Sequence, residues 1–138
     1  MRIVSYRDHH FAGVDALWRC CFPGDPPRNR ASVAIPAKLA VSDDLLLVAE
    51  KAEGQVLGTV MAGYDGHRGW LYAVACDPAW RRQGIASALI EEACRRLTAL
   101  GCAKVNLQIR AGNEEAAAFY RGLGFEEEAR ISMGLRLS

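Results

Sequence analysis

The pattern of apolar and polar positions predicts alternating strands and helices in the second half of the chain. Apolar residues recur at helical spacing over residues 85–100, which predicts a helix that ends at Gly101. Apolar and polar residues alternate strictly over residues 104–110, which predicts a strand. With a strand over residues 70–78, these segments are expected to form a βαβ unit whose two strands run parallel.

Weaker patterns predict the other elements. Asp8 can cap a helix with apolar residues from Phe11 to Cys21, and Pro36 interrupts a weakly helical stretch over residues 28–41. A last helix is expected over residues 113–122. A tight turn at Glu53–Gly54 joins two strands of a hairpin. Strands are expected over residues 2–6, 45–51, 56–65 and, as one or two short strands, 125–137.

This order of elements predicts an α+β (α/β) fold. The expected sheet is mixed and mostly antiparallel, with about six to seven strands, a central βαβ unit and about four helices. A length of 138 residues suits one domain spanning residues 1–138.

Composition narrows the classes of function. The formal net charge of +1 gives no overall attraction to nucleic acid. The longest apolar run, Leu45–Ala49, is too short to cross a bilayer, and the first ten residues lack a signal core. The five cysteines show no CxxC spacing, so no metal site is indicated. We therefore expect a cytoplasmic protein without nucleic-acid or membrane partners.

The segment RRQGIA, from Arg81 to Ala86, carries the main chemical signal. It lies between a predicted strand and a predicted helix, and the first amides of a helix attract anions. Gly84 lets an anion approach the backbone, and the two arginines add positive charge. A surface turn with two solvated arginines is the alternative reading of the same segment.

The stretch VACDPAWRRQGIASALI resembles the first motif of the GNAT family of N-acetyltransferases, and NEEAAAFYRGLGF resembles a second motif of that family. The segment from Gly58 to Pro78 is similar to the YpeA-type bacterial branch. The resemblance implies the GNAT fold and transfer of an acetyl group from acetyl-CoA to a primary amine of a small molecule, peptide or protein. The resemblance is also compatible with a homodimer. A non-catalytic acyl-CoA-binding module is the alternative.

The resemblance also implies roles for individual residues. The backbone N–H of Val74 would polarise the acetyl carbonyl, and Tyr120 would protonate the leaving thiolate. Coenzyme-binding positions carried over in this way are Val74, Ala75, Cys76, Arg81, Arg82, Gln83, Gly84, Ile85, Ala86, Ser87, Asn113, Ala116, Phe119 and Tyr120.

Some roles stay open. From spacing alone Tyr120 can equally be a core aromatic, Asn113 a helix cap and Cys76 a buried thiol rather than an acyl-carrying nucleophile. Gln108 stands where some relatives carry a glutamate base. The candidate base is then water or an acidic residue, namely Asp65 or one of the glutamates at 126–128. His67 is a further candidate base.

Overall fold

The computed structural model describes residues 1–52 and 54–138. They divide into two compact units, residues 1–108 and 109–138. The first unit contains the sheet and three α-helices, and the second contains the last α-helix. Glu53 lies outside the described residues, and with it half of the turn expected at Glu53–Gly54. No helix in the described part of the chain combines the length and the apolar character needed to span a membrane.

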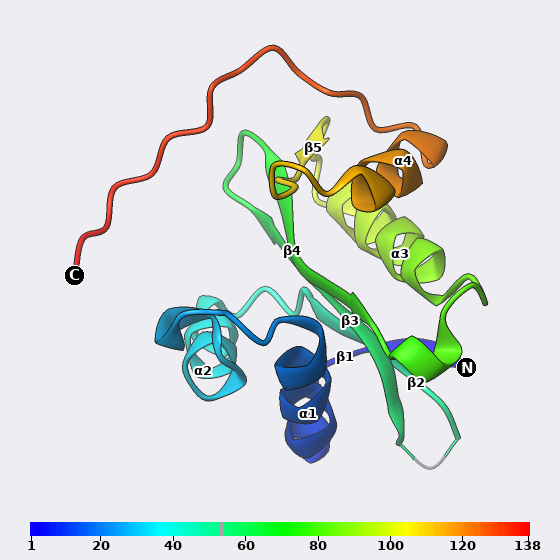
Figure 1. Cartoon of the computed structure of the whole chain (residues 1–138). Helices are drawn as coiled ribbons and strands as arrows, with labels where there is room; N and C mark the ends of the chain where they lie inside the picture. The colour runs from blue at the N-terminus through cyan, green and yellow to red at the C-terminus, as the bar shows by residue number, and fades with distance from the viewer. Residues whose placement is uncertain (53) are drawn as a thin grey trace. The chain divides into compact units, whose positions relative to one another are not determined.

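The first unit is built on one mixed sheet with strands in the order β1-β2-β3-β4-β5 (Figure 1). The first four strands form an antiparallel meander, and β4 and β5 pair in parallel. The parallel pair flanks α3 in sequence, which confirms the βαβ unit. The strand bounds are β1 Arg2–Ser5, β2 Leu46–Glu50, β3 Val56–Tyr64, β4 Gly69–Cys76 and β5 Val105–Asn106.

Helices cover both faces of this sheet. Helices α1 (Phe11–Cys21) and α2 (Ala31–Val41) lie on one side, and α3 (Ile85–Ala99) lies on the other (Figure 1). The apolar stripe of α3 is buried, as its spacing predicts. On the α1 side, Trp18 and Ile35 pack with alternate residues of β2 in the hydrophobic core. Burial of these apolar faces supplies the main stabilisation of the unit.

The fold class is confirmed as α+β with a mixed sheet and four α-helices, the last being α4 (Glu114–Gly122). Two local expectations on helices were wrong. Pro36 does not interrupt α2, which continues through it. Asp8 does not cap α1; it begins a short 3-10 helix, Asp8–His10, that leads into it. Asp8 lies in the first turn of this 3-10 helix, and His10 takes the N-cap position of α1.

The expected strand count of six to seven was too high, because five strands form among the described residues. The strand expected over residues 104–110 shortens to Val105–Asn106, and residues 125–137 contain no strand. Ile131, Met133, Leu135 and Leu137 do alternate with smaller or polar residues, yet their side chains are almost fully exposed. A strand requires a hydrogen-bonded neighbour as well as an alternating pattern.

A buried ionic network ties the start of the chain to β2. Glu50 accepts a hydrogen bond from Arg2 Nε at 2.7 Å and lies 2.7 Å from His10 Nε2. His10 Nδ1 accepts the backbone N–H of Arg7, so the ring proton is on Nε2 and points at Glu50. His9, His10 and Glu50 offer atoms at metal-binding spacing. With Nε2 donating to Glu50 and Arg2 alongside, the geometry is that of one Arg2–Glu50 ion pair supported by a hydrogen bond from His10.

Glu50 should make stability depend on pH. Its hydrogen bonds to His10 and Arg2 hold the pKa of the carboxyl below its usual value. A lowered folded pKa adds stability above the unfolded pKa of 4.5, and that stability is lost as pH falls further. We expect urea unfolding at pH 7 and pH 4 to show a smaller loss of unfolding free energy in Glu50→Gln than in the wild type. Asp15→Asn, in an exposed pair with Arg19, is the control; equal losses in Glu50→Gln and the wild type would contradict the assignment.

Candidate active site

A bulge in β4 shapes the centre of the candidate site. In the register between β3 and β4, Thr59 pairs with Ala75 and Met61 pairs with Tyr72. One residue of β3 therefore faces two residues of β4, Ala73 and Val74, which is a β-bulge. Ala73 has a φ of 49°, a left-handed conformation that is rare for a residue with a side chain. The bulge interrupts the regular ladder between Thr59 and Met61, opposite Ala73 and Val74.

A buried hydrogen-bond relay supports this bulge. The indole Nε1 of Trp18 donates to Thr59 Oγ1 at 2.9 Å, and Thr59 Oγ1 donates to the backbone carbonyl of Ala73 at 2.9 Å. Thr59 is fully buried and Trp18 nearly so. A buried polar group is costly unless it is hydrogen-bonded, so the relay ties the left-handed Ala73 to α1 and β3. No local sequence pattern marks Trp18 or Thr59 as site residues, because the relay joins residues far apart in the chain.

The other edge of β4 is open beyond the first two residues. Parallel pairing with β5 involves Gly69 and Trp70 alone. Within the described residues, no strand pairs with the stretch Leu71–Cys76 on that edge. The stretch includes Val74, Ala75 and Cys76, which the sequence analysis assigned to coenzyme binding. An extended ligand with amide groups can pair with such an edge as an added strand.

The segment from Arg81 to Gly84 forms an exposed turn before α3. Arg82 and Gly84 have φ values of 64° and 77°, and Gly84 stands at the N-cap of α3 without a side-chain cap. In the part of the chain that the structure describes, the backbone N–H groups of Ile85, Ala86 and Ser87 form no hydrogen bond. A Cβ built on Gly84 meets no atom within 4 Å. The helix thus presents open amides at its positive end.

The second unit holds the other predicted site residues on α4. Asn113 caps this helix, because its side chain accepts the N–H of Ala116 at 3.1 Å. The ring of Tyr120 packs edge-on against Phe119 and Phe125. Burial raises the pKa of the Tyr120 phenol, which therefore stays protonated at neutral pH. Asn113 is thus a helix cap, and Tyr120 carries a proton that it can donate.

Comparison with known proteins identifies the family. The profile described as the Acetyltransferase (GNAT) family matches residues 11–125. An acetyltransferase of Pectobacterium atrosepticum is 40% identical, with 99% of this chain and 96% of that protein covered. An acetyltransferase of Sodalis glossinidius is also 40% identical, over 99% of this chain and 96% of its own. The chain belongs to the GNAT family. It is an acetyltransferase of the GNAT type, and the matches favour this enzyme over a non-catalytic binding module.

Solved structures share the GNAT fold. The aminoglycoside N-acetyltransferase AAC(6′)-Iy, in complex with CoA, matches with a TM-score of 0.78 and 23% identity over 99% of this chain and 95% of that one. Ard1 from Thermoplasma volcanium matches with a TM-score of 0.81 and 21% identity over 93% of this chain and 84% of that one. At this identity the likeness concerns the fold.

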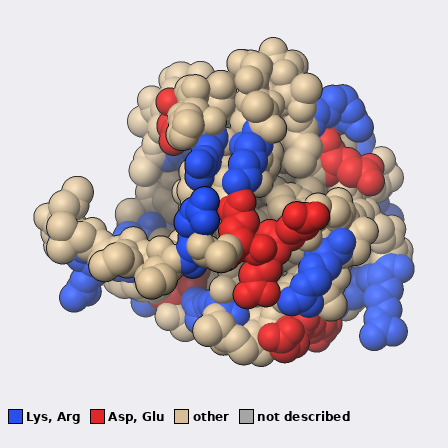
Figure 2. All heavy atoms as spheres, turned by 90° about the horizontal axis from the view of Figure 1, so that it is seen from above, with Lys and Arg blue, Asp and Glu red and all other residues tan. Residues whose placement is uncertain are grey.

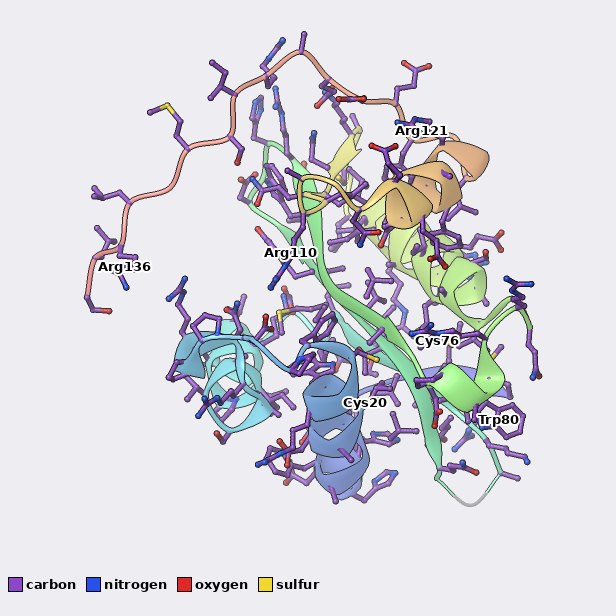
Figure 3. The ribbon with its side chains drawn as sticks, viewed as in Figure 1. Cys20, Cys76, Trp80, Arg110, Arg121 and Arg136 are labelled. Carbon is purple, nitrogen blue, oxygen red and sulfur yellow. The ribbon has the colours of Figure 1, made fainter. Side chains whose placement is uncertain are left out.

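The thiol of Cys76 is poorly suited to act as a nucleophile in this GNAT enzyme. Cys76 lies with Trp80 where β4 leads into α3, while Cys20 lies on α1 (Figure 3). Burial raises the pKa of the Cys76 thiol, so little thiolate forms at neutral pH. Its Sγ approaches the backbone carbonyls of Asp77 and Trp80. Cys76 is thus better described as a half-buried packing residue than as an acyl carrier.

The relay to Ala73 makes a stability prediction. Thr59→Val removes the hydroxyl at nearly constant volume and leaves the Trp18 indole N–H and the Ala73 carbonyl without their partner. We expect the free energy of unfolding to fall by about 1–3 kcal/mol in chemical denaturation. Thr59→Ser keeps the hydroxyl and is the matched control, expected to lose less. A Thr59→Val protein as stable as the wild type would show that the relay does not hold the bulge.

Proposed function

We propose that this chain acts as a single GNAT domain over residues 1–138 that transfers an acetyl group from acetyl-CoA to a primary amine. The acceptor is a small molecule or a peptide or protein amine, and transfer is direct, without an acyl-enzyme. The observation that carries the proposal is the set of open backbone N–H groups at the start of α3, behind an exposed turn with two arginines. The profile match runs through both units, which supports the single domain.

The start of α3 would hold the pyrophosphate of the coenzyme. The open backbone N–H groups of Ile85, Ala86 and Ser87 would bind it at the positive end of the helix dipole. Arg81, Arg82 and Gln83 are exposed in the same turn, where they can approach the phosphates. Figure 2 shows that Lys and Arg side chains lie among Asp and Glu side chains on the face it draws.

The open edge of β4 would hold the pantetheine arm. Backbone groups of Val74, Ala75 and Cys76 can pair with its two amides as a neighbouring strand would. Asn113, with Ala116 and Phe119 on the same helix, would contact the arm from α4. Both motif resemblances support this arrangement, and the open edge of β4 supports the first part of it.

The chemistry would follow from two groups of this chain. The amine nitrogen attacks the thioester carbon, and the carbonyl oxygen becomes negative; the backbone N–H of Val74 would donate to that oxygen. The carbon–sulfur bond then breaks, and the Tyr120 phenol would give its proton to the departing sulfur. Gln108 cannot take the proton of the amine, so we assign that proton to water.

Three finer assignments complete the proposal. The GTVMAGYDGHRGW segment supports membership of the YpeA-type branch. Five free cysteines, one of them exposed, fit a reducing cytoplasm. A homodimer is compatible with these assignments, and none of the roles above requires one.

Gly84→Asp tests the pyrophosphate site. Asp and Asn both tolerate the left-handed conformation of Gly84, and no atom lies near enough to clash. They differ in charge, and Asp places a negative group at the helix end where the phosphates should bind. We expect coenzyme A to raise the Tm of the wild type and of Gly84→Asn, and to leave that of Gly84→Asp nearly unchanged. Equal shifts in both variants would rule out an anion site there.

Tyr120→Phe tests the proton donor, because it keeps the ring packing and removes the hydroxyl. The leaving thiol has a pKa of about 8.5 and departs moderately well without protonation. We therefore expect kcat to fall about tenfold, equivalent to about 1.4 kcal/mol in the barrier, with little change in the KM for acetyl-CoA. Tyr64→Phe, on the β3–β4 hairpin, is the control. Should chemistry limit the rate and kcat stay unchanged in Tyr120→Phe, Tyr120 is a packing residue.

A further inference from the structure

Two aromatic side chains form an exposed platform on β4, which we call the Trp70–Tyr72 platform. Their rings stack with an interplanar angle of 16° and centroids 6.5 Å apart. β4 is an interior strand, yet Tyr72 is 51% exposed. The exposed ring surface of Tyr72, in the middle of the sheet, is available for a ligand.

The platform lies on the same face of the sheet as α1 and α2. Tyr72 is in register with Met61, and residues directly opposite on neighbouring strands share a face. Met61 packs against the core cluster formed with α1 and α2. Tyr72 is also two residues from Val74, about 7 Å along a strand. The platform is therefore close to the proposed position of the acetyl carbonyl.

A fixed carboxylate accompanies this platform. Asp65 Oδ1 accepts the backbone N–H groups of His67 and Arg68, both at 2.8 Å. These hydrogen bonds lower the pKa of the Asp65 carboxyl, which is ionised at neutral pH. Asp65 follows Gly63, the register partner of Trp70, by two residues, which places it at the hairpin end of the same face. Burial, together with the negative charge of Asp65, raises the pKa of the Tyr72 phenol.

One positive charge at this face, that of Lys38, is already paired. Lys38 Nζ lies 3.6 Å from the position that a Cβ on Gly63 would take. Gly63 is on β3, two residues after Met61 and two residues before Asp65. It donates to Asp43 at 2.7 Å and to the carbonyl of Ala62 at 2.6 Å. Lys38 therefore neither repels a cation strongly nor competes for Asp65.

We propose that the Trp70–Tyr72 platform and Asp65 bind a second, non-reacting ammonium group of the acceptor, which makes the acceptor an aliphatic di- or polyamine. This inference rests on the proposed function, since it takes Val74 as the site of the acetyl carbonyl. The reacting amine lies at Val74, the methylene chain crosses the platform, and the distal ammonium lies over a ring face, next to Asp65. Because its pKa is low, Asp65 is a counter-ion rather than the base.

Substrate series with matched monoamines test the proposal. The probes are putrescine and its longer homologues, each compared with the n-alkylamine of the same chain length. We expect wild-type kcat/KM to favour the diamine of each pair, with a preference that depends on chain length. Asp65→Asn removes the charge, while its amide oxygen can still accept the two backbone N–H groups. It should lower kcat/KM about fivefold more for the diamine than for the monoamine, chiefly through KM.

Two further variants give the controls. Glu91→Gln removes one negative charge from the exposed side of α3, on the opposite face of the sheet, and should keep the diamine preference. Tyr72→Leu keeps an apolar side chain but has no π face, so this variant should lose the diamine preference. Calorimetry of putrescine binding to the coenzyme A complex measures the same contacts without turnover, and its affinity should fall in Asp65→Asn and Tyr72→Leu.

Equal kcat/KM for diamines and monoamines in the wild type would overturn the inference. An equal loss for both substrates in Asp65→Asn would also overturn it, since that result indicates an effect on the turn. In either case acetylation of monoamines and a Tm shift with coenzyme A would leave the proposed function standing. Failure of every amine and of coenzyme A binding would instead overturn the proposed function, and this inference with it.

Discussion

The hydrogen-bond relay from Trp18 through Thr59 to the carbonyl of Ala73 is the interaction on which the candidate site depends. It couples α1, β3 and β4, and it holds Ala73 in a backbone conformation that costs free energy. That conformation accompanies the bulge at which Ala73 and Val74 depart from regular pairing with β3. The bulge therefore connects packing under α1 with the position of a backbone N–H at the site.

Most of the proposed coenzyme site is made of backbone rather than side chains. The open edge of β4 and the first turn of α3 both offer N–H groups that already point outward. Such donors need no side-chain ordering when a ligand binds, so little conformational entropy is lost. The side chains that matter in this part of the site are small or absent, as at Gly84 and Ala86, because access to the backbone is what the ligand requires.

The two faces of the sheet carry different parts of the candidate site. α3 packs on one face and follows β4, the strand that carries Val74, along the chain, while α1, α2 and the Trp70–Tyr72 platform lie on the other. Asp65 illustrates how environment assigns a role to an acid. Two backbone N–H groups lower its pKa, which makes it a good partner for a cation and a poor acceptor of a proton. The same residue type in an apolar pocket would favour proton transfer.

The sequence by itself determined the elements whose signals are local. The stripe of α3, the glycine before it, and the capping side chain of Asn113 all act over one or two helical turns, so spacing predicts them. The tertiary structure decided the rest, because the deciding contacts join distant residues. The hydrogen-bond relay through Thr59 and Trp18 holds Ala73 in a left-handed conformation, and an alanine at position 73 does not predict that conformation. Conversely, residues 131–137 have the alternation of a strand and form none, because a strand exists through the neighbour that pairs with it.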